Sequence, residues 1–277
     1  MTIIELTSRH NPVFKQIRLI ASQSRRAPKS IVLAEGIRSL EEAAKAGCKT
    51  ECALVSDDFG KDLREIALLS HWNKHGTKLF RARRALIETV SDVQSFQGAL
   101  ALVQIPPRSL ETIMLERNPL ILCICGIQDP GNMGTLIRTA IASGVSLVCT
   151  TKGSVSASNP KAIRASAGAF FHLPPVENLT TAELLDFLSS HRIKILRADP
   201  RAVLPYTGCS FRAPCAILLG NEGQGFSAAD WEGSQPVAIP MARGVESLNV
   251  AVAGAVILFE ACRQRSSWNK QHTYKTA

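Results

Sequence analysis

The sequence lacks the features that would send a chain into or across a membrane. It has no run of about twenty apolar residues, which a bilayer-spanning helix needs. Its first residues show no basic stretch followed by an apolar stretch and a small-residue cleavage site. Internal repeats and low-complexity tracts are also absent. We therefore expect a folded, cytoplasmic protein with no membrane partner.

The sequence also lacks the spacings that bind metal ions. None of the eight cysteines forms a CxxC pair of the kind that zinc sites favour. His71 and His75 lie four residues apart, but the glutamate of an HExxH motif is missing. We expect no metal ion. The cysteines, among them Cys123 and Cys125 in PLILCICG, are interpreted as small core residues in a reducing compartment.

Positive charge, by contrast, is abundant and gathers at both ends of the chain. The sequence has 32 lysines and arginines against 23 acids, a net charge of +9. Residues 1–30 hold six basic side chains and one acid, and residues 261–277 hold four and none. This excess favours a polyanionic partner such as RNA, while solvated ends that keep the protein soluble are the alternative interpretation.

The length of 277 residues and a pair of prolines predict two domains. Four runs before the prolines have the length and composition of strands: IVLAEG (31–36), ALVS (53–56), KLFRA (78–82) and ALALVQI (99–105). The run IRSLEEAAKAG has a helical period and ends at Gly47. Pro106 and Pro107 remove ladder donors and stiffen the chain. We therefore predict domains at 1–106 and 107–277, the second with a basic tail.

The second domain is predicted to have an α/β fold with a parallel sheet. Five of its runs are almost continuously apolar: LILCICGI (120–127), SLVCTT (146–151), KILRA (194–198), CAILLG (215–220) and PVAIP (236–240). Such runs are typical of parallel strands covered on both faces, and helical segments lie between them.

Two of these helical segments stand out. GNMGTLIRTAIASG carries a predicted buried stripe of Leu136, Ile137, Ala140 and Ile141. The last helix is apolar almost all round from residue 250 to 259, so we expect it in the domain centre or in a subunit interface.

Three loops follow predicted strands, at the sheet edge where α/β folds bind ligands. In GIQDPGNMGTLIR (126–138), Asn132 and Arg138 are either site residues or only a helix cap and a surface arginine. CAILLGNEGQGFS (215–227) has three glycines within six residues but is not GxGxxG, which disfavours a dinucleotide-binding oxidoreductase. In VAIPMARGVESLNVAVAG (237–254), Ser247 is a possible N-cap and Asn249 an exposed first-turn residue.

In this order and with these residues, the three loops closely resemble the signature motifs of the SpoU family of RNA ribose methyltransferases, within the SPOUT superfamily. The likeness covers about residues 115–265 and includes NPKAIRASAGAFFHLP (159–174), between the first and second motifs. The N-terminal part, with HNPVFKQIRLI and AEGIRSLEEAAKAG, resembles more loosely the ribosomal-protein-like α/β domain that often precedes this catalytic domain.

The resemblance implies methylation of a ribose 2′-hydroxyl in structured RNA with S-adenosylmethionine as cofactor. Ribosomal RNA is favoured over transfer RNA, because compact tRNA enzymes of this kind often lack the extra domain. The resemblance also implies a trefoil knot in the parallel-sheet catalytic domain and a homodimer through the C-terminal helix. A non-catalytic RNA-binding or ribosome assembly factor with the same fold is the alternative.

The resemblance assigns residues to roles as well. The implied catalytic set is Arg138, Asn132, Glu222, Ser247 and Asn249. The implied cofactor-binding set is Gly220, Asn221, Gly225, Ile239, Pro240 and Leu248. RNA contacts are expected at Lys161, Arg164, Arg9 and Lys15, with a solvated surface as the alternative. A guanidinium holds its proton too firmly to act as a base, so we expect Arg138 to bind phosphate and stabilise the developing alkoxide.

Overall fold

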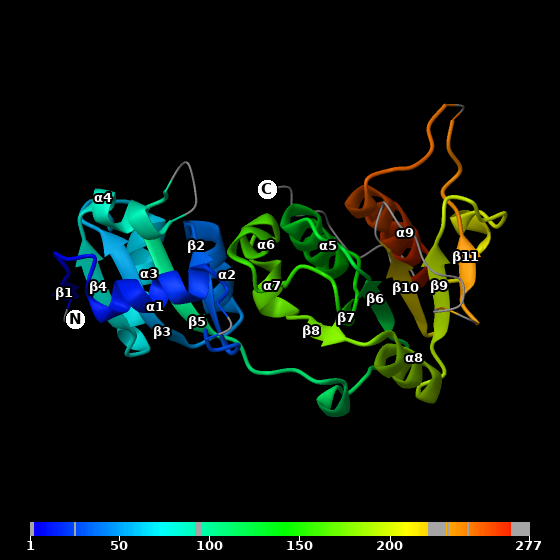
Figure 1. The fold of residues 1–277 in the computed structure, drawn as a ribbon, viewed down its shortest axis with the longest axis horizontal. Helices are drawn as coiled ribbons and strands as arrows, with labels where there is room; N and C mark the ends of the chain where they lie inside the picture. Colours follow the sequence, from blue (N-terminus) through cyan, green and yellow to red (C-terminus); the bar gives the residue numbers. More distant parts are fainter. Residues whose placement is uncertain are drawn as a thin grey trace. The chain divides into compact units, whose positions relative to one another are not determined.

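The computed structural model describes residues 3–24, 26–91, 96–220, 231, 233–242 and 244–266 of the chain. It divides into two compact units (Figure 1). Unit 1 comprises Met1–Arg108 together with Ser156–Pro174, and unit 2 comprises Ser109–Val155 and Pro175–Ala277. Among the described residues, none of the helices has the length and apolar character needed to cross a bilayer.

Unit 1 is built on a five-stranded sheet in the order β1-β4-β3-β5-β2. Its strands are β1 (Ile3–Glu5), β2 (Ile31–Glu35), β3 (Thr50–Ser56), β4 (Lys78–Ala82) and β5 (Ala99–Gln104). β5 runs antiparallel to β2 and β3, and the other pairings are parallel. The carboxyl ends of β2, β3 and β4 therefore lie at one edge of the sheet, together with the start of β5.

The helices of unit 1 follow from local signals in the sequence. They are α1 (Pro12–Ala21), α2 (Ile37–Lys45), α3 (Leu63–Lys74), α4 (Arg84–Ile87), the single turn η1 (Glu88–Val90), α6 (Pro160–Ala165) and α7 (Ala169–His172). α1 begins with Asn11 as N-cap and a proline in its first turn, and it buries Phe14, Ile17 and Ile20 against the sheet. α3 begins with a capping box formed by Asp62 and Glu65. α2 ends before Gly47, as predicted.

The segment 156–174 packs onto the rest of unit 1 by a close contact and two polar contacts. Gly168 has a φ of +88°, and a Cβ at this position would lie 2.4 Å from Cβ of Glu42, so no other residue fits without displacement. His172 Nε2 lies 2.9 Å from Oε2 of the same glutamate. Arg164 Nη1 lies 3.0 Å from Oε2 of Glu35, whose side chain is only 2% exposed.

Unit 2 contains a fully parallel six-stranded sheet in the order β11-β9-β10-β6-β7-β8. The strands are β6 (Leu120–Ile124), β7 (Leu147–Thr151), β8 (Val176–Leu179), β9 (Lys194–Ala198), β10 (Cys215–Leu219) and β11 (Gln235–Val237). β6 and β10 are neighbours at the centre and buried along their whole length. The predicted parallel α/β sheet is therefore confirmed.

The helices of unit 2 are α5 (Pro130–Ala142), α8 (Thr181–Ser190), α9 (Val250–Arg265) and the single turns η2 (Leu110–Thr112) and η3 (Tyr206–Gly208). α9, drawn in red, runs beside α5, drawn in green (Figure 1). The predicted stripe of α5 is correct except at Ile141, which is 37% exposed; Met133 is buried in addition to the predicted residues.

β11 covers only part of its predicted run. The run at 236–240 continues as β11 only to Val237. Ala238 pairs instead with the segment after β9, because its N–H donates to Leu204 O and its carbonyl accepts from Tyr206 N, both at 2.8 Å. Ile239 and Pro240 consequently lie in a loop, which leads towards α9.

The cysteines are core residues, as expected. All eight are free thiols, and six of them are buried. Burial raises the pKa of Cys125 to about 12 and that of Cys52 to about 11. Among the described residues, no group of three or more histidine, cysteine, aspartate or glutamate side chains is arranged to hold a metal ion.

Candidate active site

The first signature loop leaves the centre of the unit 2 sheet and is held from two sides. Cys125 N, directly after β6, donates to Leu219 O at the end of β10, at 2.8 Å. From the side of β7, Val155 N donates to Ile127 O at 2.7 Å, and Ser154 Oγ accepts from Gly126 N at 2.9 Å. The carboxyl ends of β6 and β10 and the loops that follow them therefore share one edge of the sheet.

α5 begins one turn earlier than an Asn132 cap would place it. Asp129 is the N-cap, and its Oδ1 accepts from Asn132 N at 2.7 Å. Pro130 occupies the first turn, where its missing N–H costs nothing. The interpretation of Asn132 as the helix cap is wrong, and its side chain is available for another contact.

Asn249 is the N-cap of α9, so the alternative that Ser247 caps this helix is also wrong. Asn249 Oδ1 accepts from Ala251 N at 2.9 Å and from Val252 N at 3.3 Å. Its Nδ2 donates to Asn132 Oδ1 at 3.0 Å. Only one orientation of the amide satisfies both roles, since the oxygen accepts and the nitrogen donates. The first and third signature loops thus meet through two of the five residues of the implied catalytic set.

The close packing of α9 against α5 and β10 supports this contact between the two loops. A Cβ on Gly254 of α9 would lie 2.5 Å from Leu136 Cδ2 of α5 and 2.6 Å from Leu219 Cδ1 of β10. Both leucines are fully buried and packed, so they have little freedom to move aside. Because Gly254 has no side chain, α9 can pack this closely against both α5 and β10.

Arg138 lies on an exposed face of α5. It is six residues after Asn132, which corresponds to about 9 Å along the helix and about a third of a turn around it. It makes no hydrogen bond or ion pair with any residue that the structure describes. The structure therefore brings Asn132 and Asn249 together and leaves this guanidinium free in solvent nearby on the same helix.

Four of the six residues that the resemblance assigns to cofactor binding are described, and they lie around the same edge, together with Ser247 of the implied catalytic set. Gly220 follows β10 directly, and Ile239, Pro240, Ser247 and Leu248 belong to the loop between β11 and α9. Gly220, Ile239 and Leu248 are half-buried, whereas Pro240 and Ser247 are exposed. Within the described residues, the N–H groups of Ile239 and Leu248 have no acceptor. Half-buried aliphatic side chains beside open main-chain donors suit a ligand with a flat polar ring. Asn221, Glu222 and Gly225 lie outside the described residues.

The basic residues predicted to contact RNA fall into two groups. Arg9, Lys15 and Lys161 are exposed, and none pairs with an acid among the described residues. Arg164 instead forms the ion pair with the buried Glu35 described above.

The predicted C-terminal basic arm differs from expectation as far as it is described. Arg263 pairs with Glu260 one turn earlier in α9, at 2.7 Å. Arg265 donates to main-chain carbonyls. Both arginines belong to the ordered end of a helix, and Lys270 and Lys275 lie outside the described residues.

Sequence reasoning missed a pocket of about 630 Å³ in unit 1. It lies between α2 and α3, beside the loops that follow β2 and β4. Its lining is strongly polar: Ile37, Arg38, Glu41, Glu42, Lys45, Arg64, Glu65, Arg84 and Gln97. The only hint in the sequence is the density of charge in RSLEEAAK and RARR.

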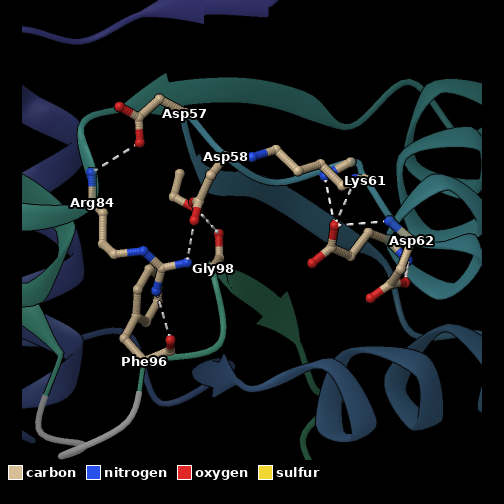
Figure 2. A network of polar contacts seen from close by, with 10 residues as sticks. Asp57, Asp58, Lys61, Asp62, Arg84, Phe96 and Gly98 are labelled. Atoms are coloured by element: carbon tan, nitrogen blue, oxygen red, sulfur yellow. Dashed lines mark hydrogen bonds and ion pairs between the residues drawn. The ribbon is translucent and has the colours of Figure 1, made fainter.

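Most of the charges in this pocket are already paired. Arg84 Nη2 lies 2.7 Å from Asp58 Oδ2, and its Nη1 donates to Phe96 O at 2.8 Å, as Figure 2 shows. Hydrogen bonds from Ser56 and Arg84 lower the pKa of the Asp58 carboxyl. Lys45 and Arg64 pair with the two glutamates of α2. Arg38 is the lining cation that has no acidic partner among the described residues.

Comparison with known proteins identifies the class to which this fold and site belong. The family model of SpoU rRNA methylases matches residues 119–259, about half of the chain, and the model of an MRM3-like substrate-binding domain matches residues 11–101. The chain therefore belongs to the SpoU rRNA methylase family.

Relatives and solved structures match over nearly the whole chain. RlmP of Bacillus subtilis, a 23S rRNA guanosine-2′-O-methyltransferase, is 28% identical over 92% of this chain and 98% of its own. A crystal structure of an RNA 2′-O-ribose methyltransferase is 32% identical, with a TM-score of 0.81 over 95% of this chain and 99% of its own. The SpoU methyltransferase AviRb from Streptomyces viridochromogenes, crystallised with its cofactor AdoMet, is 26% identical, with a TM-score of 0.81 over 93% and 99%.

The double role of Asn249 leads to a prediction that separates stability from activity. Asn249→Asp keeps the oxygen that caps α9 but removes the donor to Asn132, whereas Asn249→Ala removes both. We expect Asn249→Asp to unfold at nearly the wild-type urea concentration and Asn249→Ala to lose about 1 kcal/mol. Both variants should lose methyl transfer to RNA. Full activity in Asn249→Asp would contradict a functional role for the contact between the two asparagines.

Proposed function

We propose that this protein methylates a ribose 2′-hydroxyl of ribosomal RNA with S-adenosylmethionine as methyl donor. One observation carries the proposal: the hydrogen bond between Asn132 and Asn249 joins the first and third signature loops of a SpoU family member. The activities of its relatives support the same reaction. The family leaves the dinucleotide-binding oxidoreductase alternative without support.

The residues at the sheet edge fit this cofactor. Gly220 allows close main-chain approach after β10, and the half-buried side chains of Ile239 and Leu248 offer an apolar surface to an adenine ring. The open N–H groups of the same two residues can donate to its ring nitrogens. When bound, the cofactor supplies a methyl group on a positively charged sulfur, which is already a good electrophile.

The protein's main task is then to align the ribose oxygen and to help it lose its proton. The oxygen must lie about 3–3.5 Å from the methyl carbon and in line with the bond that breaks. Ser247 and the Asn132–Asn249 pair hold the ribose in the proposed arrangement. Arg138 binds the adjacent phosphate and stabilises the negative charge that develops on the oxygen, while the proton leaves to phosphate or water.

This role for Arg138 predicts a loss of rate without a loss of cofactor affinity. We expect Arg138→Ala to lower kcat by about 100-fold and to leave the Kd for S-adenosylmethionine within twofold, because the guanidinium acts on the RNA. Steady-state methylation at saturating RNA and calorimetry measure the two quantities.

Arg138→Lys distinguishes this role from that of a base. A lysine in the role of base would give a rate that rises steeply with pH towards 10, whereas a bound cation gives no such rise. Full turnover in Arg138→Ala would refute the assignment. Failure of the wild-type protein to bind S-adenosylmethionine would overturn the proposed function as a whole.

Selection of the RNA belongs to unit 1 in this proposal. The match of residues 11–101 to a substrate-binding domain supports it, as do the exposed cations Arg9, Lys15 and Lys161. Arg38 adds an exposed cation to the lining of the 630 Å³ pocket. Contacts of this kind bind phosphates and set the register of the RNA, while base edges carry the sequence information.

Lys161 and Arg164 give a matched pair for testing which cations of α6 meet RNA. Lys161→Ala should weaken RNA binding and reduce its salt dependence by about one counterion, with stability unchanged within about 0.5 kcal/mol. Arg164→Ala should instead destabilise the fold by about 2–4 kcal/mol, because it takes the guanidinium from a buried carboxylate. Filter binding across a salt series and urea unfolding measure the two effects. An Arg164→Ala variant of wild-type stability would contradict the structural role.

The proposal includes a homodimer formed through α9. Its support is an apolar face left open on this helix, where Val252 is 49% and Phe259 51% exposed, with Ile141 of the neighbouring α5 37% exposed. A second copy of the chain is the proposed occupant, since one self-complementary face closes a two-fold dimer. The trefoil knot expected from the resemblance also stays part of the proposal, supported by the overall similarity to the solved SpoU enzymes.

The dimer is testable with a charge on the exposed face. Phe259→Asp should convert a dimer to a monomer in light scattering after size exclusion, because an unpaired buried carboxylate opposes association. Val203→Asp is the matched control: Val203 is fully exposed in the same unit and should leave the dimer intact. A monomeric wild-type protein would refute this part of the proposal.

A further inference from the structure

The last turn of α9 is anchored by a single arginine to four main-chain carbonyls. Arg265 Nε donates to Phe211 O at 2.6 Å, and Nη1 donates to Asn118 O at 2.8 Å. Nη2 donates to Ala213 O at 2.6 Å and to Pro119 O at 3.1 Å. These carbonyls belong to the segments that lead into β6 and β10.

The neighbouring residue strengthens the anchor. Gln264 Nε2 donates to Cys209 O at 2.8 Å, and its Oε1 accepts from Phe211 N at 2.9 Å. The end of α9 is thus fixed to the amino ends of the two central strands by planar groups with directional hydrogen bonds.

α9 connects this anchor to the active-site edge. It has 16 residues, which corresponds to about 24 Å. Its first end carries Asn249, at the carboxyl edge of the sheet, and its last end carries Arg265, at the amino edge. The apolar packing between the two ends holds α9 close to α5 and β10, but it is not directional. The hydrogen bonds of Arg265 are directional and act at the far end of the helix from Asn249.

We propose that Arg265 is a positioning residue for methyl transfer: by fixing the axial position of α9 it places Asn249 against Asn132 and Leu248 at the cofactor edge. The inference rests on the proposed function and deepens it. Arg265 lies outside the stretch that matches the SpoU family model, which ends at residue 259. It is also one of the cations that charge alone would give to an RNA-binding arm.

The chain offers a natural control two residues away. Arg263 has the same charge and lies on the same turn of α9, but its side chain is 72% exposed and pairs with Glu260. An effect of general positive charge at this end would appear in variants of either arginine. An effect of anchoring would appear only at Arg265.

The experiment compares Arg265→Ala, Arg265→Lys and Arg263→Ala in the full-length protein, well below the Tm of each variant. We expect Arg265→Ala to raise the Kd for S-adenosylmethionine and to lower kcat, each by about tenfold, because small misplacements of aligned groups are costly. The KM for RNA should stay within twofold. Arg265→Lys should show a smaller loss of the same kind, since one ammonium cannot serve four carbonyls, and Arg263→Ala should match the wild type.

Each other outcome overturns the inference. Wild-type cofactor affinity and kcat in Arg265→Ala with a lower Tm would make the anchor one of stability alone. If Arg265→Ala and Arg263→Ala both raise the KM for RNA and leave the cofactor affinity unchanged, Arg265 contributes to RNA binding and not to positioning. If Arg265→Ala does not fold, the Kd for S-adenosylmethionine and the kcat of Arg265→Lys test the inference instead. A wild-type protein that does not bind S-adenosylmethionine would overturn the proposed function and this inference with it, whereas equal binding by wild type and Arg265 variants overturns the inference alone.

Discussion

The close approach of α9 to α5 and β10 is the constraint on which the site depends. At Gly254 the helix backbone lies so near Leu136 and Leu219 that a single methyl group would overlap both. Because the two leucines belong to α5 and β10, this contact sets the spacing of the three elements next to which the signature loops lie. The hydrogen bond between Asn249 and Asn132 is made within that spacing.

The two asparagines show how helix capping and function share one side chain. Asn249 ends the loop from β11, caps α9 with its oxygen and reaches Asn132 with its nitrogen. The cap fixes the side chain in one rotamer, so the contact between the loops costs little further entropy. An aspartate at N-cap in α5 has the complementary effect: by accepting from Asn132 N it leaves the Asn132 side chain to face the other helix.

The sequence predicts those parts of this protein that depend on local pattern. β4 and β9 match their predicted runs to the residue. β1 and β8, of three and four residues, carry too little pattern to be seen. The N-caps of α5 and α9 are ambiguous in the sequence for another reason. Two competent residues stand within three positions at the start of α5 and of α9, and only the backbone turn decides between them. Pro130 was the usable signal for α5.

Charge is the property that sequence reasoning assigns least well here, because composition counts cations without showing what they touch. Arg164 is one of the residues expected to contact RNA, yet its partner is a buried glutamate 129 positions earlier. Arg265 belongs to the most basic tail, yet its donors are used by carbonyls around 50 and around 147 positions away. Both still contribute to the long-range field that attracts a polyanion, since that field depends on charge and not on contact. Direct contact with phosphate requires donors that the fold leaves open. Within the described residues, Arg9, Lys15, Arg38, Arg138 and Lys161 are among the side chains that meet that condition. The net charge of +9 therefore attracts RNA as a whole, while only cations with open donors bind its phosphates directly.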